Sequence, residues 1–307
     1  MDIAALIVAA GFSAGEDEFK PMRSIGSISA AQRVIATLSQ AGCRRIVMVT
    51  GYNATMLERH LSGAGIIFLR NEHYGTTQMF DSVKIGLAYL RDKCDRLLFT
   101  PVDIPLFTAK TVKTILKADA LLACPRCKGI QGHPVLIANE LIPELLADQG
   151  GRGLEGALER CSVPLKCIEV DDPGTIYDMD ASACSGLMDL HNSQLVRPVL
   201  SVSLAREKSF FNSKIAMLLM LIDETKSVRA AGQRMQLSYS SCWNIIRTLE
   251  SQLEYPLIER SQGGAGGSSS ILTLRGREFL DRYTAYEKAL KEEADAMFDR
   301  YFGGMFE

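Results

Sequence analysis

The apolar positions of the first 190 residues fall in short runs, separated by amphipathic stretches. Five runs are almost continuously apolar, which is typical of strands buried on both faces: Ile3–Ala9, Arg45–Thr50, Ile66–Leu69, Arg96–Thr100 and Ala120–Cys124. Four stretches between them have helical spacing: Ala30–Gln40, Thr55–Leu61, Asp81–Arg91 and Ala109–Lys117. This alternation predicts an α/β domain with a Rossmann-like, mostly parallel sheet that helices cover on both faces.

The pattern changes toward the C-terminus. Residues 191–212 are weakly periodic and are interpreted as a linker, whereas helical patterns separated by polar turns begin at Ser213. We therefore expect a first domain over residues 1–190 and a second over residues 213–307.

The second domain has the pattern of a winged helix-turn-helix. A short helix from Val228 is followed by a turn at Ser238 and a second helix over Tyr239–Gln252. The second helix would bury Cys242, Ile245, Ile246 and Leu249 and leave outward Ser240, Ser241, Asn244 and Arg247. Hydroxyl, amide and guanidinium groups suit base edges and phosphates, so these four residues are candidate DNA contacts.

A glycine-serine hairpin tip and a long last helix complete this domain. Pro256–Arg260 and Ile271–Leu274 flank the tip as a β-wing, and Arg260 and Arg275 are further candidate DNA contacts. The last helix, Arg277 to about Tyr301, is two-faced, and we expect it to form a homodimer. A protein-interaction domain is the alternative interpretation.

Composition and charge restrict the partners. The chain is 47% hydrophobic and 23% charged, with a net charge of −2, so attraction to DNA must be local. Residues 226–282 hold eight basic and five acidic residues, a net charge of +3. No apolar run reaches membrane-spanning length and no secretory signal is visible, which predicts a cytoplasmic protein without membrane contact. Eight scattered cysteines fit a reducing compartment, and the Cys124–Cys127 CxxC has no second pair at zinc spacing.

An anion-binding turn follows the first predicted strand. Ala10 and Gly11 come directly after Ala9, and their lack of bulk lets backbone N–H groups approach an anion. Lys20 adds a positive charge nearby in the sequence. These residues predict a phosphate-binding site.

Three aspartates are candidate ligands of a divalent cation. Asp103 follows the strand that ends at Thr100, and Asp178 and Asp180 alternate in a segment interpreted as extended, which places both carboxylates on one side. Hard oxygen ligands of this kind bind Mg²⁺. A strand-end aspartate alone is equally typical of a turn cap, so the prediction depends on these acids occurring together with the phosphate turn.

Together and in order, these segments resemble the nucleotidyltransferases that complete molybdenum cofactor by attaching CMP or GMP to molybdopterin. The resemblance extends over roughly the 190 residues of the first domain. The matching pieces are Val8–Gly11, Phe19–Pro21, Val49–Tyr52, Asn71–Gly86, Pro101–Pro105, Gly132–Val135, Gly151–Gly153 and Asp171–Asp180.

The resemblance implies that a substrate phosphate attacks the α-phosphate of an NTP and that pyrophosphate leaves. It assigns catalytic roles to Lys20 and Asp103, and Mg²⁺ to Asp103 with Asp178 or Asp180. It assigns nucleotide binding to Ala9, Ala10, Gly11, Phe12, Ser13, Lys20, Asp81 and Ser82, and the pterin side to His133 and Arg152. The Ala-Ala-Gly form of the turn favours CTP over GTP.

One segment departs from the family pattern, which has Arg-x-Gly between the turn and the lysine. This chain has Gly15-Glu16-Asp17. A carboxylate about 4 Å from a phosphate repels it by about 1 kcal/mol in water and several times more near a protein surface. Three interpretations remain open. The phosphate-binding site binds nucleotide weakly or without turnover, or Glu16 and Asp17 point outward, or Arg23 replaces the arginine of the family pattern.

The C-terminal segment resembles the winged helix-turn-helix of ModE-type molybdate-responsive regulators, and less closely that of LysR-type regulators. The matching pieces are Ser227–Ala231, Ser238–Trp243, Pro256–Arg260, Gly263–Gly267 and Leu272–Gly276. This resemblance implies double-stranded DNA as a partner. No molybdate-binding domain follows in the sequence, so we do not expect direct molybdate sensing.

Two functions remain open from the sequence. The first is a Mg²⁺-dependent molybdenum cofactor cytidylyltransferase that carries its own DNA-binding module. The second is a catalytically impaired sensor, in which nucleotide or cofactor binding regulates transcription in molybdenum metabolism.

Overall fold

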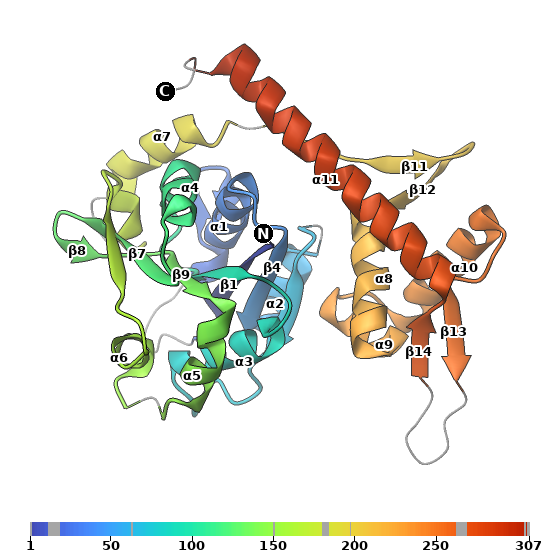
Figure 1. The fold of residues 1–307 in the computed structure, drawn as a ribbon, viewed down its shortest axis with the longest axis horizontal. Helices are drawn as coiled ribbons and strands as arrows, with labels where there is room; N and C mark the ends of the chain where they lie inside the picture. The colour runs from blue at the N-terminus through green and yellow to red at the C-terminus, as the bar shows by residue number, and fades with distance from the viewer. Residues whose placement is uncertain are drawn as a thin grey trace. The chain divides into compact units, whose positions relative to one another are not determined.

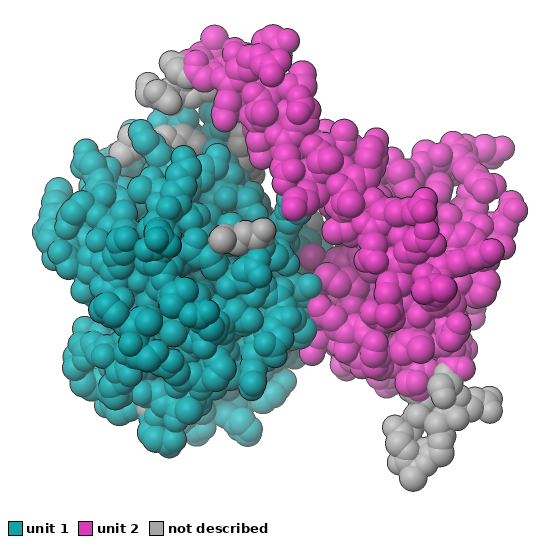
Figure 2. Space-filling view, in the orientation of Figure 1, with its two compact units in different colours: residues 1–196, 307 teal, residues 197–306 magenta. Residues whose placement is uncertain are grey.

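The computed structural model describes residues 2–11, 19–62, 64–149, 151–179, 184–196, 198–261, 269–303 and 305. The chain divides into two compact units, residues 1–196 with residue 307 and residues 197–306, which are coloured separately in Figure 2. Among the described residues, no helix is long and apolar enough to cross a membrane.

The first unit is built on an eight-stranded sheet (Figure 1). Its strand order is β10 (Lys166–Glu169), β7 (Leu122–Cys127), β9 (Val135–Ala138), β6 (Arg96–Pro101), β1 (Ile3–Ala9), β4 (Arg45–Thr50) and β5 (Ile67–Arg70), with β8 (Ile130–Gln131) paired to β7. All neighbours pair in parallel except those of β9 and β8. The mostly parallel α/β fold expected from the sequence is therefore confirmed.

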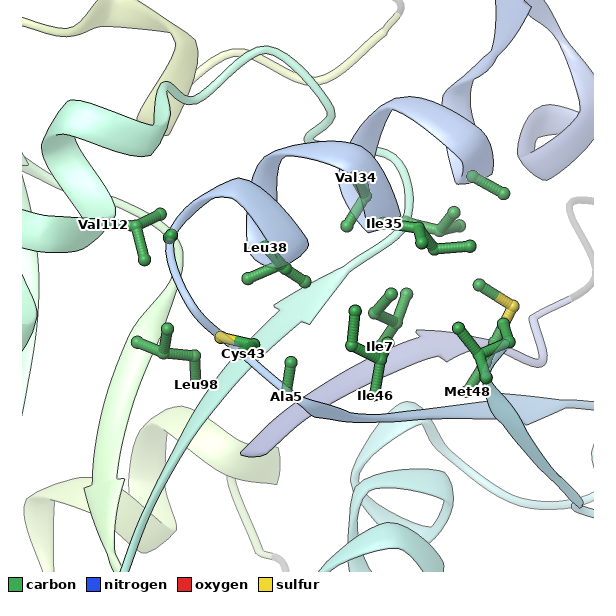
Figure 3. Close-up of a cluster of buried hydrophobic side chains, with 14 of the residues drawn as sticks. Ala5, Ile7, Val34, Ile35, Leu38, Cys43, Ile46, Met48, Leu98 and Val112 are labelled. Carbon is green, nitrogen blue, oxygen red and sulfur yellow. The ribbon is translucent and has the colours of Figure 1, made fainter. Parts of the chain in front are cut away.

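Helices cover both faces of this sheet. On one face α1 (Ala30–Gln40) and α4 (Ala109–Lys117) pack over the central strands, and Figure 3 shows Val34 and Leu38 of α1 above Ala5 of β1. On the other face α3 (Met79–Leu90) lies so close to β1 that a Cβ on Gly86 would stand 2.1 Å from the Leu6 side chain. The remaining helices are α2 (Ala54–His60), α5 (Ile142–Ala147), α6 (Gly153–Glu159) and α7 (Cys184–Gln194).

The sheet register brings three loops to the same edge. Ala9 at the end of β1 pairs with Thr50 at the end of β4, and Val8 pairs with Pro101 at the end of β6. Ligands of open α/β sheets bind at the carboxyl ends of the strands. The fold therefore collects the loops that follow β1, β4 and β6 into one potential site.

The second unit contains the helix-turn-helix. A hairpin of β11 (Ser203–Ala205) and β12 (Ser209–Asn212) precedes α8 (Ser213–Thr225), α9 (Val228–Arg234) and α10 (Tyr239–Leu253). The wing strands β13 (Ile258–Ser261) and β14 (Ser269–Leu272) pair antiparallel, and α11 (Leu274–Phe302) follows. The Phe211 ring packs edge-to-face on Tyr283 of α11, at 4.7 Å between centroids, which joins the first hairpin to the last helix.

The stretch interpreted as a linker contains the end of α7 and the strands β11 and β12. His191 was expected to be a surface or connector residue, but only 2% of it is exposed. Its Nδ1 lies 2.9 Å from Arg33 Nη1 and its Nε2 lies 3.0 Å from the Phe107 carbonyl oxygen. That expectation was wrong because His191 belongs to α7, which packs against the rest of the first unit. Local periodicity does not reveal this contact.

The CxxC segment lies in a strand. Cys124 and Cys127 both belong to β7, and Cys124 Sγ lies 3.9 Å from Cys167 Sγ on β10. Burial raises the pKa of Cys124 to about 12, which keeps this thiol protonated and disfavours metal binding. The described residues contain no cluster of three or more acids, histidines and cysteines suited to a metal.

Candidate functional site

A cavity of about 480 Å³ opens at the carboxyl edge of the central strands. The lining includes four of the predicted phosphate and metal residues, namely Ala10, Gly11, Lys20 and Asp103, together with Ala9 and Ser82. Lys20 belongs to a short 3₁₀ turn, Lys20–Met22, and is half-buried. The structure thus brings the predicted anion turn, the lysine and the strand-end aspartate to one cavity.

The loops around this cavity are in close backbone contact. Tyr52 N donates to the Ala10 carbonyl oxygen at 3.2 Å. A Cβ on Gly51 would stand 2.6 Å from that same oxygen, closer than real Cβ contacts come. Only glycine therefore allows the β4 loop to approach the turn after β1 this closely.

The segment that carries Asp178 lies beside Asp103. Met179 N donates to the Asp103 carbonyl oxygen at 3.0 Å, and Asp178 is exposed. Mg²⁺ typically takes one or two carboxylates and completes its shell with substrate phosphates and water. Asp103 supplies such a carboxylate beside the phosphate-binding turn, and Asp178 lies on the neighbouring segment without lining the cavity.

Several predicted residues lie outside the described part of the chain. They are Phe12, Ser13 and Asp180, together with the Gly15-Glu16-Asp17 segment. Their roles stay predictions.

A buried amide orders the loop on the α3 side of the cavity. Asn71 is 3% exposed, and its Nδ2 donates at 2.9 Å to both Thr77 Oγ1 and Ser82 Oγ. Its Oδ1 accepts from His73 N at 3.0 Å. The polar atoms of this amide therefore tie the loop that carries Thr77 to Ser82 of α3, and both residues line the cavity.

Four predicted site residues within the described part of the chain do not line this cavity, namely Asp81, His133, Arg152 and Asp178. Asp81 accepts from Gln78 N at 2.9 Å and caps α3. Arg152 is exposed and pairs with Glu159 at 2.6 Å. Their predicted nucleoside and pterin roles find no direct geometric support in the cavity lining.

His133 occupies a different environment from the cavity residues. Its ring packs against Phe99 at 5.6 Å between centroids, and its buried Nδ1 has no hydrogen-bond partner among the described residues. Burial lowers the pKa of His133 to about 4, so the ring is neutral at neutral pH. A neutral imidazole with an open buried nitrogen can accept or donate one hydrogen bond, but it adds no charge.

In the second unit, α10 presents the expected polar face. Ser240, Ser241, Asn244 and Arg247 are exposed, whereas Cys242, Ile246 and Leu249 are buried. Ser238 caps the helix, accepting from Ser241 N at 3.0 Å. Trp243 is buried, whereas Ile245, which was expected in the core, is half-buried.

The wing contacts the same helix through an aromatic pair. The Arg260 guanidinium lies 3.6 Å above the Trp243 ring, and Tyr239 packs edge-to-face on that ring at 6.1 Å. This contact holds the Arg260 side chain against α10. Arg275, at the start of α11, lies 5.6 Å from the Tyr255 ring centroid.

Sequence reasoning missed the apolar part of the cavity lining. Phe19, Tyr52, Met56, Tyr74 and Met79 all contribute to it. Sequence analysis assigned none of these five side chains a role in binding, and Met79 is 50% exposed. The available signal was that these residues lie in or next to the loops that follow β1, β4 and β5, although nothing local marks them as exposed.

Comparison with known proteins follows this division of the chain. The MobA-like NTP transferase domain matches residues 5–165, and the helix-turn-helix domain of bacterial regulatory proteins of the lysR family matches residues 217–277. The transcriptional dual regulator ModE of Escherichia coli K12 is 27% identical over 94 residues, 31% of this chain and 36% of ModE. The bifunctional protein GlmU of Carboxydothermus hydrogenoformans is 31% identical over 85 residues, 28% of this chain and 18% of GlmU.

Among solved structures, a nucleotidyl transferase from Methanothermobacter has the same fold. It superposes with a TM-score of 0.52 at 19% identity, over 62% of this chain and 98% of that protein. The chain thus spans a whole nucleotidyltransferase fold but only about a third of ModE and a fifth of GlmU. Because the match over residues 5–165 covers more than half of the 307 residues, this protein belongs to the MobA-like NTP transferase family and carries that domain fused to a LysR-type helix-turn-helix domain.

Proposed function

We propose that the first unit transfers a nucleotidyl group from an NTP, CTP in preference to GTP, to a molybdopterin-type phosphate. One observation carries this proposal: the turn after β1, Lys20 and Asp103 line one cavity at the carboxyl edge of the sheet. In this reaction an acceptor phosphate oxygen bonds to the α-phosphorus, the bond to the bridging oxygen breaks, and pyrophosphate leaves. The membership of the MobA-like family supports the reaction class.

The residues around the cavity have separate proposed roles in binding the triphosphate and Mg²⁺. The backbone N–H groups of Ala10 and Gly11 and the ammonium of Lys20 would bind the triphosphate. Asp103, with Asp178 on the neighbouring segment, would hold Mg²⁺. The cation, when bound, would offset the negative charge that develops at the α-phosphate.

Pyrophosphate release tests this proposal. Wild-type protein is incubated with CTP or GTP, Mg²⁺ and molybdopterin, beside an Asp103→Ala variant. Release that depends on molybdopterin and is lost in the variant supports the enzyme. Equal background in both proteins contradicts it and favours the alternative, a regulator that senses a nucleotide or cofactor without turnover.

We propose that the second unit binds double-stranded DNA through α10. The match to a LysR-type helix-turn-helix supports this, as do the exposed hydroxyl, amide and guanidinium groups of Ser240, Ser241, Asn244 and Arg247. Arg260 and Arg275 would contact the phosphate backbone beside the helix.

The last helix supports a homodimer as the DNA-binding form. Large apolar side chains on α11 are exposed, namely Leu274, Tyr286, Met297, Tyr301 and Phe302. A second copy of the same helix would cover these side chains. Dimeric helix-turn-helix proteins bind the two half-sites of an operator, one with each subunit. Sedimentation analysis of wild type and Tyr301→Glu tests this: a dimer that the substitution dissociates supports it, and a wild-type monomer contradicts it.

A further inference from the structure

The cavity that holds Lys20 and Asp103 has an apolar wall made of large side chains. We define the aromatic wall as Phe19, Tyr52 and Tyr74, with the two methionines Met56 and Met79 beside it. The Phe19 and Tyr52 rings are 5.8 Å apart between centroids, and the Tyr52 and Tyr74 rings are 6.2 Å apart. The three rings therefore contact one another in a row, at interplanar angles of 75° and 59°.

This wall is open to the cavity rather than packed into the core. All three rings are half-buried, and Met56 and Met79 are 45% and 50% exposed. An exposed group of large apolar side chains that lines a polar cavity marks a place where a ligand buries apolar area. Packing alone gives no reason for both methionines to remain exposed here.

The wall is fixed to the phosphate turn by backbone contacts. Tyr52 N bonds to the Ala10 carbonyl oxygen, and a Cβ on Gly51 would stand 2.7 Å from Tyr74 Cβ. Tyr74 N also donates at 3.3 Å to the carbonyl oxygen of Asn71, the buried amide that orders this loop. The aromatic wall and the anion turn are thus parts of one preorganised scaffold.

We infer that the aromatic wall binds the nucleobase of the NTP by its face, with Tyr74 as the main stacking surface and the methionine thioethers against the ring. This inference rests on the proposed function, because it assigns the base of the same NTP. Aromatic side chains stack on any base, since every base has a π-face, and thioethers contact aromatic rings favourably. Tyr74 also lines the neighbouring hollow, where Asn53 and Met56 continue the surface.

Calorimetric titration with three probes tests the inference: Mg-CTP, Mg-GTP and Mg-tripolyphosphate, which has no base. Replacing one stacking ring by alanine is expected to weaken base binding about tenfold. Tyr74→Ala should therefore lower the affinity for both nucleotides about tenfold and leave the affinity for tripolyphosphate unchanged. Tyr74→Phe, which keeps the ring, should bind all three probes like wild type.

The outcomes separate the base site from the phosphate site. If Tyr74→Ala weakens all three probes equally, or none of them, the base-stacking role is overturned. If wild type binds tripolyphosphate as tightly as the nucleotides, the wall is overturned while the phosphate site stands. If wild type binds no probe, the proposed function fails as well. Leu121→Ala, which removes an exposed apolar side chain that lines neither this cavity nor the neighbouring hollow, is the matched control for folding.

Discussion

Replacing His191 by asparagine should make the first unit less sensitive to acid. In the structure the Phe107 carbonyl oxygen can only accept, so Nε2 carries the proton, and Nδ1 accepts from the Arg33 guanidinium. Burial and then the positive charge of Arg33 lower the pKa of His191 from 6.5 to about 4. The folded protein therefore keeps this ring neutral in a range where the unfolded chain protonates it.

The direction and size of the effect follow from linkage. Because the unfolded state binds more protons between the two pKa values, the stability from His191 is complete above pH 6.5 and is lost as the pH falls toward 4. One pKa unit corresponds to about 1.4 kcal/mol, so the loss reaches about 3 kcal/mol below pH 4 and about 2 kcal/mol at about pH 5. Asparagine can still accept from Arg33 but does not titrate.

Urea unfolding at about pH 7.5 and about pH 5 measures the difference. Far-UV circular dichroism follows the whole chain, and fluorescence of Trp243, the single tryptophan, reports the second unit as an internal control. Acidification from about pH 7.5 to about pH 5 should lower the free energy of unfolding of His191→Asn by about 2 kcal/mol less than that of wild type. The urea unfolding transition followed by Trp243 fluorescence should be the same in both proteins. Because His133 titrates alike in both proteins, it cancels. An equal loss of stability in variant and wild type would refute the reasoning, and His73→Asn on the surface is the matched control.

Three further predictions concern the cavity and α10. Asp103→Asn should lower pyrophosphate release by at least about 100-fold while the unfolding midpoint stays unchanged, because it removes the half-exposed carboxylate that we propose as a Mg²⁺ ligand; retained turnover would exclude Asp103 as a ligand. Gly51→Ala should destabilise the first unit by roughly 1–3 kcal/mol and weaken NTP binding in calorimetry, since its Cβ would press on a backbone oxygen; wild-type stability would mean that the loop moves freely. Arg247→Ala should weaken DNA binding in mobility-shift titrations. If Arg247 contacts a phosphate, the slope of the logarithm of the binding constant against the logarithm of salt concentration should also fall by about 1. Unchanged binding would exclude α10 as the DNA-recognition helix, and Lys288→Ala on α11 is the control.

The element pattern was predictable because it depends on short-range spacing. The runs from Ile3 and from Arg96 became β1 and β6, and the helix expected from Tyr239 became α10. Sequence alone did not predict β9, which enters the sheet antiparallel between β6 and β7. Its four apolar residues resemble any other buried strand, and strand order is set by crossovers that span many residues.

The polar half of the candidate site was also visible in the sequence. Lys20 and Asp103 were recognised because a glycine turn after one strand and an aspartate after another are chemically distinctive. The placements of Asp81 as a helix cap and of Arg152 in a surface ion pair were not, because hydrogen-bond partners decide what a charged side chain does.

The sequence by itself therefore determined the two kinds of domain, the buried strands and the charged residues available for phosphate chemistry, because each follows from local periodicity or residue type. Only the tertiary structure decided which residues share the cavity. Tyr52 and Tyr74 follow different strands and meet because β4 and β5 pair in parallel. His191 is buried because α7 packs into the first unit, where Arg33 and the Phe107 carbonyl oxygen contact its ring. Such contacts arise from the packing of segments far apart in the chain, and no local pattern encodes them.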